Sequence, residues 1–538
     1  MFRLRWFLIE SKSLSMRSPV MQSLLSLSGT GILFAVAYLA STVWGADWPQ
    51  YRGLNHDGSS SELIRTNWAQ KPPTIVWKKS INPAWSSITL AGGKAFTQGN
   101  RLFMNASSEF CIALDAGTGA ELWATFLDAA SYPDGGTGST DGPRSTPSVD
   151  GEFVYVYNSY LRLFCLRTSN GAVVWSRDFI NEFPGTKVIP WQNAASPLIV
   201  GDLIYVNSNV ANQTLMALRK SDGVTVWKGQ TDTMTHATPV YATIAGTPQV
   251  VFQTLKGLVG VTPSTGAVLW RYNFTPSSTS TASTPIIADD YIYGSCAYAK
   301  GAWTARVTRS GSTFSAGQAN YTGANSAYQN HWATPVHHGG YLYGIVEKSS
   351  HSLACFSLEG RTNRWITSTV GSGSPGFASI IKVGGKLLVL RESGELVLIE
   401  PNPTNYTEIA RYQALSGTSW NHPAFSNGRI YARSNNQIVA LDVAAAPLPL
   451  PILKMNVDLL PSKTHLRIQV VAQNGLPLDP EAVGRIELSS TTGLAGTNQW
   501  TPLDSIFTSN DGKLQSEVPL VLSATNRFIR VRERIITP

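Results

Sequence analysis

The stretch "DAGTGAELW" (Asp115 to Trp123) contains the turn and the tryptophan on which the fold of this chain depends. Close variants return as "TSNGAVVW", "KSDGVTVW" and "PSTGAVLW", each with a glycine four residues before the tryptophan. Glycine adopts the positive φ that a tight hairpin turn needs, and the strand that follows holds the tryptophan at a fixed height. A large flat ring at that height can fill the gap between neighbouring sheets. The repeated tryptophans are therefore predicted to be structural.

This turn belongs to a repeat that extends over residues 73–447. Each unit opens with a small residue, often followed by proline, and continues with short strand-like runs such as "FVYVY" and "FCLRT". Successive units begin roughly 40 to 60 residues apart, which suits four short strands per unit. The eight units begin near Ser86, Ser145, Ala195, Ala237, Ser283, Ala333, Ala378 and His422.

The eighth unit stops at "IVALDV" without an outer strand, and the run "TIVWKKSI" (Thr74 to Ile81) precedes the first unit. A strand from the start of the chain that completes the last sheet would close a ring and remove the free sheet edges. We therefore predict an all-β fold. It is an eight-bladed β-propeller of four-stranded blades closed by an N-terminal strand, with a small C-terminal β-sandwich-like domain.

The regions outside the repeat have distinct compositions. Residues 18–46 are uncharged and follow several arginines, which predicts a signal peptide over residues 1–45; an uncleaved membrane anchor is the alternative. Residues 46–72 form an N-terminal extension. The Pro-rich run "AAAPLPLPIL" precedes strand-like runs, which predicts a separate β-domain over residues 448–538. The chain is thus expected to be exported, either periplasmic or extracellular, and tethered to a membrane only through its N-terminal segment.

Charge and cysteine content exclude several classes of protein. The formal net charge is +8 without a dense basic run in the body of the chain, which argues against nucleic-acid binding. The four cysteines (Cys111, Cys165, Cys296 and Cys355) lie far apart inside apolar runs, which favours buried thiols over a disulfide framework. The sequence has no CxxC, HExxH or paired-histidine motif, so no metal site is predicted.

The turns of the form TG-x-x-x-W resemble those of the pyrroloquinoline quinone (PQQ) repeat propellers, the quinoprotein alcohol dehydrogenase-like superfamily. "ADWPQYRG" and "DGPRSTPSVDGEFVYV" (Asp141 to Val156) are similar to a secreted bacterial branch of that group. The resemblance covers roughly residues 46–445 and implies the propeller fold. Such propellers include PQQ-dependent dehydrogenases and also an outer-membrane assembly lipoprotein that binds no quinone and acts as a protein-binding scaffold.

The enzyme site of those dehydrogenases does not transfer to this chain. The resemblance implies an adjacent cysteine pair over the quinone and a Glu, Asn and Asp set around Ca²⁺. This chain has no adjacent cysteines, and no motif places the Ca²⁺ ligands. We therefore expect no cofactor, no catalytic residue and no metal, with PQQ and Ca²⁺ as the alternative.

A candidate ligand site lies in the links that connect each outer strand to the next inner strand. In a propeller these links reach toward the central axis, so their side chains are expected to converge. Aromatic, arginine, amide and histidine side chains there would suit a planar or anionic ligand or a sugar ring; a solvated or plugged channel is the alternative. The candidates are Trp85, Arg144, Trp191, Gln192, Asn193, His236, His331, Trp332, Phe377, Trp420 and His422.

Three functional hypotheses follow from this pattern. The first is an exported, non-catalytic propeller that binds a protein or an extracellular ligand on one face. The second is a divergent PQQ-dependent alcohol or sugar dehydrogenase, and the third is a carbohydrate-binding propeller. The repeated turn specifies the ring without specifying its chemistry.

Overall fold

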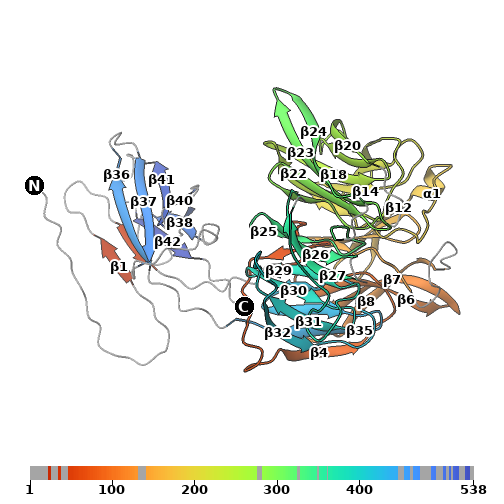
Figure 1. Ribbon diagram of the computed structural model, residues 1–538, viewed down its shortest axis with the longest axis horizontal. Coiled ribbons are helices and arrows are strands. Elements are labelled where there is room, and N and C mark those ends of the chain that lie inside the picture. Colours follow the sequence, from red (N-terminus) through yellow and green to blue (C-terminus); the bar gives the residue numbers. More distant parts are fainter. Residues whose placement is uncertain are drawn as a thin grey trace, which may run out of the picture. The chain divides into compact units, whose positions relative to one another are not determined.

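The structure is a computed structural model that consists almost entirely of β-strands (Figure 1). One compact unit spans Gly45–Ala446, and a second combines segments from both ends of the chain. No helix among the described residues is long and apolar enough to cross a membrane. The described residues are 22–25, 34–37, 47–130, 141–274, 281–323, 327–347, 351–359, 362–445, 453–460, 465–472, 486–491, 501–503, 508–510, 513–519 and 528–533.

The larger unit is an eight-bladed β-propeller, as predicted. The four strands of each blade pair antiparallel, and in blades one to seven they follow one another in sequence. Blades one to four consist of β5 (Thr89–Ala91), β6 (Lys94–Phe103), β7 (Ala106–Asp115) and β8 (Glu121–Ala129); β9 (Ser148–Asp150), β10 (Phe153–Tyr157), β11 (Arg162–Arg167) and β12 (Val173–Asp178); β13 (Leu198–Val200), β14 (Leu203–Asn207), β15 (Leu215–Arg219) and β16 (Thr225–Gly229); and β17 (Val240–Ile244), β18 (Thr247–Thr254), β19 (Gly257–Val261) and β20 (Val268–Asn273).

The remaining blades follow the same plan. A single short helix, α1 (Phe179–Glu182), follows the outer strand of blade two in the described part of the chain. Blades five to eight consist of β21 (Ile286–Ala288), β22 (Tyr291–Cys296), β23 (Gly301–Ser310) and β24 (Thr313–Tyr321); β25 (Val336–His338), β26 (Tyr341–Val346), β27 (Ser352–Ser357) and β28 (Asn363–Thr367); β29 (Ser379–Val383), β30 (Lys386–Leu390), β31 (Glu395–Ile399) and β32 (Glu408–Gln413); and β33 (Ala424–Ser426), β34 (Arg429–Arg433) and β35 (Gln437–Asp442) with β4 (Thr74–Ser80).

The ring closes through the N-terminal strand, which confirms the prediction from "TIVWKKSI". Strand β4 pairs antiparallel with β35 and supplies the outer strand of blade eight. In Figure 1 the orange β4 lies against the last blade, next to β35 and β32. Because blade eight thus contains both ends of the repeat, unfolding either end opens a sheet edge.

The repeated glycine and tryptophan interlock neighbouring blades. The turn glycines have left-handed φ values; that of Gly223 is 72°. A Cβ atom on Gly223 would lie 2.7 Å from the ring of Trp175, the tryptophan of the preceding blade. The Nε1–H of Trp175 also donates to the carbonyl of Lys220, 3.1 Å away, in that same turn. The same contact recurs where Gly119, Gly171 and Gly266 face Trp77, Trp123 and Trp227.

The contact between neighbouring blades changes where the sequence departs from the repeat. The Nε1–H of Trp270 donates to Gln249 Oε1 inside its own blade, because the next blade has the longer β23–β24 hairpin in place of the glycine turn. Trp365 in blade six still donates to the carbonyl of Asn402 in blade seven. The interlock therefore survives in blade seven, where the facing turn has no glycine, but not where the hairpin length changes.

Residues 47–65 cross the ring before β4 begins and are called the strap below. In blade three, the side chain of Gln50 accepts from the N–H of Ile199 and donates to its carbonyl. The guanidinium of Arg52 then reaches blade six, where it donates to the carbonyls of Thr334 and Pro335. Blades three and six lie well apart around an eight-membered ring, so the strap passes over the axis.

The rest of the strap fixes it to blades seven and eight. Strand β3 (Ser59–Ser60) pairs parallel with β29. The carboxylate of Glu62 accepts from the backbone N–H groups of Asn427 and Gly428, in the turn between the first two strands of blade eight. The strap thus lies on the face that carries the hairpin turns after the first strands. The axial links enter the ring from the opposite face.

The four cysteines are separate buried thiols in four different blades, as the sequence predicted. The second unit contains two sheets, one of β36 (Leu453–Leu459), β37 (His465–Ala472), β41 (Lys513–Pro519) and β40 (Thr508–Asn510), the other of β39 (Thr501–Pro502), β38 (Ile486–Thr491) and β42 (Phe528–Glu533). The predicted signal segment lies outside the described residues, except for the paired strands β1 (Gln22–Leu25) and β2 (Phe34–Ala37). Most of the predicted Pro-rich linker also lies outside them.

Candidate ligand-binding site

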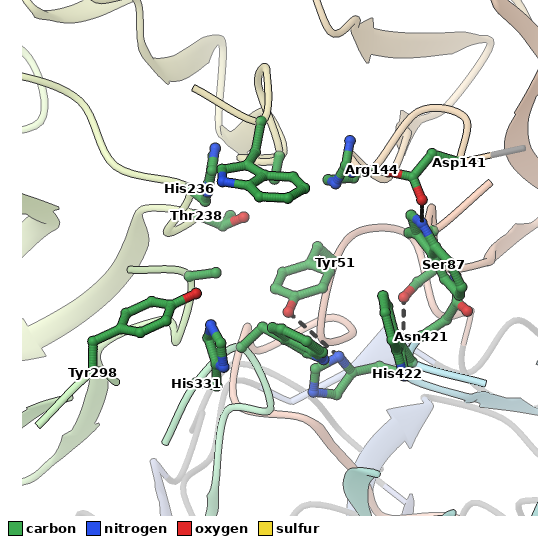
Figure 2. Close-up of a pocket in the computed structure, with 16 residues that line it drawn as sticks. Tyr51, Ser87, Asp141, Arg144, His236, Thr238, Tyr298, His331, Asn421 and His422 are labelled. Atoms are coloured by element: carbon green, nitrogen blue, oxygen red, sulfur yellow. Dashed lines mark hydrogen bonds and ion pairs between the residues drawn. The ribbon is translucent and has the colours of Figure 1, made fainter. Parts of the chain in front are cut away.

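A cavity of about 310 Å³ lies where the axial links meet. Its lining residues come from the strap, from the links that enter seven of the eight blades and, for Tyr298, from the turn between β22 and β23. This places the cavity on the propeller axis (Figure 2). It is called the axial pocket below. Eight of the residues predicted from the links line it: Trp85, Arg144, Trp191, His236, His331, Trp332, Trp420 and His422.

Three predicted residues, Gln192, Asn193 and Phe377, lie beside the axial pocket and do not line it. The Nδ2–H of Asn193 donates to the carbonyls of Asn158 and Ala195, so this amide holds its own link in shape. The side chain of Gln192 is buried, and its backbone carbonyl contacts His236 Nε2 at 2.7 Å. The side-chain amide of Asn193 and the backbone carbonyl of Gln192 thus hold the link that carries Trp191.

Trp191 has an unusual backbone conformation. Its φ is 67°, and that of the next residue, Gln192, is 56°. Bulky residues rarely adopt the left-handed region, at a cost of about 1–3 kcal/mol, and such strain is typical of functional positions. The strained link leaves the indole of Trp191 42% exposed at the axial pocket. The strained backbone of Trp191 thus holds an aromatic face exposed to solvent in the axial pocket.

A continuous aromatic wall forms another side of the axial pocket. Trp85 stacks on Trp420 with ring centroids 4.3 Å apart, and Trp420 lies 5.0 Å from Trp332. Trp332 in turn stacks on Phe377 at 4.2 Å, behind the lining. The rings come from the links that enter blades one, six, seven and eight. Offset aromatic pairs of this kind stabilise one another by about 0.5–1.5 kcal/mol, which keeps the wall rigid.

The charged groups of the axial pocket neutralise each other. The carboxylate of Asp141 is buried and forms an ion pair with Arg144. It also accepts a hydrogen bond of 2.7 Å from the Nε1–H of Trp85. Figure 2 shows this pair at one side of the pocket, above Ser87. Asp141 is therefore engaged on both oxygens and is a poor candidate for a general base.

The three histidines of the axial pocket are neutral at physiological pH. Burial, with the positive charge of Arg144 nearby, lowers the pKa of His236 from 6.5 to about 4. Burial and the neighbouring His351 lower the pKa of His331 to about 4 as well. Burial lowers the pKa of His422 to about 3, with a further contribution from Arg52. Desolvation disfavours the charged imidazolium, so these rings act as neutral polar groups.

Sequence reasoning missed the floor of the axial pocket. Tyr51, from the strap, lies in the middle of the labelled residues in Figure 2, and its hydroxyl is 3.3 Å from His422 Nδ1. The motif "ADWPQYRG" contains this tyrosine, but it has no repeat partner that would reveal its place on the axis. Because the strap crosses the face opposite the links, Tyr51 closes one end of the pocket. The other lining residues missed were Ser87, Ala194, Thr238, Ala282, Tyr298 and Asn421.

Acidification is expected to destabilise the propeller. An unfolded histidine titrates near 6.5, so between about pH 6.5 and 4 the unfolded chain binds more protons than the folded chain. The free energy of unfolding therefore falls as the pH drops through this window. Urea unfolding at about pH 7 and pH 5 should show a lower midpoint at pH 5.

A histidine variant tests whether the buried histidines cause this pH dependence. His236 faces Arg144, His422 faces Arg52, and His331 faces His351 and the carboxylate of Glu347. In His236→Gln the difference between the two midpoints should shrink. An unchanged difference would assign the pH dependence to other groups.

A calcium–quinone centre requires a different set of donors. Ca²⁺ takes about six to eight oxygen ligands, usually with several carboxylates. The axial pocket has one carboxylate, Asp141, which is already paired with Arg144 and Trp85. Over the described ranges, no group of three His, Cys, Asp or Glu residues could hold a metal ion. The residues present therefore do not fit PQQ with Ca²⁺.

Comparison with known proteins finds similarities in sequence and in fold. Residues 112–367 match the sequence model of outer membrane protein assembly factor BamB. No curated protein matches the chain in sequence. A quinohemoprotein alcohol dehydrogenase from Comamonas testosteroni is 14% identical with a TM-score of 0.54, over 83% of this chain and 85% of that one.

Two further solved structures are similar. A quinohemoprotein alcohol dehydrogenase from Pseudomonas putida HK5 is 12% identical with a TM-score of 0.52, over 77% of this chain and 83% of that one. BamB from Moraxella catarrhalis is 16% identical with a TM-score of 0.49, over 69% and 97%. At such identities a structural likeness shows the fold alone. Residues 112–367 are thus similar in sequence to a PQQ-repeat family model, and the propeller shares its fold with the quinohemoprotein alcohol dehydrogenases.

Proposed function

We propose that this protein is an exported, non-catalytic propeller that binds an extracellular ligand, free or presented by a partner protein, in its axial pocket. The observation that carries the proposal is the state of the polar groups there. Asp141 is paired with Arg144 and Trp85, and the three histidines are neutral. A pocket with rigid aromatic walls and mutually neutralised charges is suited to holding a ligand and poorly suited to moving protons.

Three further observations support this assignment. The strap closes one end of the channel, so the axial pocket is a cup with a defined floor. The family model that matches residues 112–367 describes an assembly factor, which is a binding role. Export is supported by the charge-free segment after the N-terminal arginines. The location is thus proposed to be periplasmic or extracellular.

Titration with PQQ and Ca²⁺ separates binding from quinone-dependent oxidation. We expect no saturable heat when the purified full chain is titrated with PQQ in the presence of Ca²⁺. We also expect no alcohol-dependent reduction of an electron-accepting dye. The physical reason is the lack of a free carboxylate set for the cation in the axial pocket.

The opposite result would overturn the proposed function. That result is saturable binding of PQQ that weakens in Arg144→Ala, together with dye reduction. Arg101→Ala provides a matched control, because Arg101 forms an ion pair with Glu121 outside the axial pocket. Binding lost equally in both variants would indicate non-specific attraction of the anionic quinone.

A further inference from the structure

The axial pocket presents flat apolar faces from separate sectors of the ring. Trp191 reaches it from the link into blade three, and the stacked pair of Trp85 and Trp420 reaches it from the links into blades one and eight. Trp191 is 42% exposed, and its left-handed backbone holds it in place. Faces that approach from different sides can cover the two sides of a ring-shaped ligand.

The charge of the axial pocket favours a neutral ligand. The ion pair of Asp141 and Arg144 contributes no net charge, and neutral imidazoles contribute none at pH 7. An anionic ligand would meet a guanidinium already neutralised by Asp141, and a cationic ligand would meet a carboxylate already neutralised by Arg144. Burying a charge without a net opposite charge beside it is costly, so either kind of ligand would bind less tightly.

The axial pocket also has hydrogen-bond donors without acceptors. The Arg144 Nη1 and the Trp332 Nε1 are buried and have no hydrogen-bond partner within the described structure. Both groups can only donate. Both atoms are covered in this structure, so the side chains must turn toward a bound ligand before its oxygen acceptors satisfy them. Satisfying a buried donor avoids a penalty of about 1–3 kcal/mol.

We infer that the axial pocket binds the terminal sugar residue of a neutral carbohydrate. A pyranose ring combines C–H faces that pack on indole rings with hydroxyl and ring oxygens that accept hydrogen bonds, and it carries no charge. The volume of about 310 Å³ lies at the lower end of the range for ligand pockets, which suits one end of a glycan rather than a long segment. This inference rests on the proposed function, because it names the ligand class of the same pocket.

Calorimetric titration of the full chain with a defined panel tests the inference. The neutral probes are cellobiose, maltose, xylobiose and diacetylchitobiose; the charged probes are digalacturonate and choline. We expect at least one neutral probe to bind saturably, with an affinity that stays constant between about 0.05 and 0.5 M salt, because a neutral ligand is not screened. Trp191→Ala should weaken that binding by about tenfold or more.

Phe103→Ala is the matched control. Phe103 is 40% exposed, close to the value for Trp191, but it lies at the end of a hairpin in blade one and does not line the axial pocket. Its removal should leave the dissociation constant unchanged. Equal losses in the two variants would mean that sugars contact exposed rings at random, which overturns the inference.

The remaining outcomes separate the two proposals. If no neutral probe binds, the carbohydrate inference is wrong. If only digalacturonate or choline binds, with salt-sensitive affinity that Trp191→Ala reduces, the non-catalytic binding function stands and the ligand class is wrong. If PQQ with Ca²⁺ supports dye reduction, the proposed function itself fails.

Discussion

Gly223→Ala is expected to lower the free energy of unfolding of the propeller by about 2–5 kcal/mol. The φ of Gly223 is 72°, a conformation that costs an L-residue about 1–2 kcal/mol. The added methyl would also lie 2.7 Å from the ring of Trp175, closer than atoms can approach, so the two blades must shift apart. Forcing an extra group into a packed interface typically costs about 1–3 kcal/mol. Urea unfolding followed by tryptophan fluorescence measures the loss.

The same blade provides a control that isolates the contact with the tryptophan. Gly201 also has a left-handed φ, 58°, but a Cβ atom there meets nothing within 4 Å. Gly201→Ala should therefore cost about 1–2 kcal/mol, the backbone contribution alone. In the double variant Gly223→Ala/Trp175→Ala the two losses should be less than additive, because truncating the ring removes the clash. Equal losses for Gly201→Ala and Gly223→Ala would contradict the interlock between blades.

These glycines and tryptophans are also the reason that the fold could be predicted. A contact that recurs between successive blades imposes the same residues at the same spacing, so the repeat is visible in the sequence. The direction of the chain then fixes which links reach the axis, and eight candidates in the axial pocket followed from that geometry. Where the contact is lost, at the β23–β24 hairpin, the repeat in the sequence also fades.

The parts of the axial pocket that escaped prediction involve residues outside the repeat. Tyr51 lies in the strap, and tertiary contacts such as those of Arg52 and Gln50 bring it onto the axis. Gln192 and Asn193 were expected in the axial pocket because they lie in the link into blade three. Consecutive side chains of an irregular link point in different directions, however, and the amide of Asn193 is used by the carbonyls of Asn158 and Ala195. The spacing of residues in the sequence does not determine in which direction each of these side chains points.

The pairing of Asp141 with Trp85 and Arg144 also could not be predicted from the spacing of residues in the sequence. Trp85 and Asp141 belong to the links of neighbouring blades, and their hydrogen bond depends on the exact path of each link. That bond decides whether the carboxylate is free to act as a base or to bind a cation. The sequence could therefore predict the aromatic, arginine and histidine content of the axial pocket. Its neutral electrostatic state required the structure.

Arg52→Leu is expected to destabilise the propeller by about 3–5 kcal/mol, because it removes the central anchor of the strap. Arg52 is 2% exposed, and its guanidinium donates to three backbone carbonyls, of Asp57, Thr334 and Pro335, at 2.7–3.1 Å. Hydrogen bonds from a charged donor contribute about 1.5–3 kcal/mol each, although their sum is not additive. Leucine fills the volume but leaves the carbonyls without donors. Urea unfolding again measures the difference.

The role of Arg52 in holding the strap has a second readout, limited proteolysis. Once the anchor is lost, the strap should detach before the blades unfold, so cleavage within residues 47–65 should become faster than in the parent chain. Arg219→Leu serves as the control, because Arg219 forms an exposed ion pair with Asp222 that contributes about 0–1 kcal/mol. Equal unfolding and equal cleavage of Arg52→Leu and Arg219→Leu would contradict this role of Arg52. The strap would then be held by its strand pairing with β29 and by Glu62. Tyr51 would form the floor of the axial pocket without an anchor at the neighbouring residue.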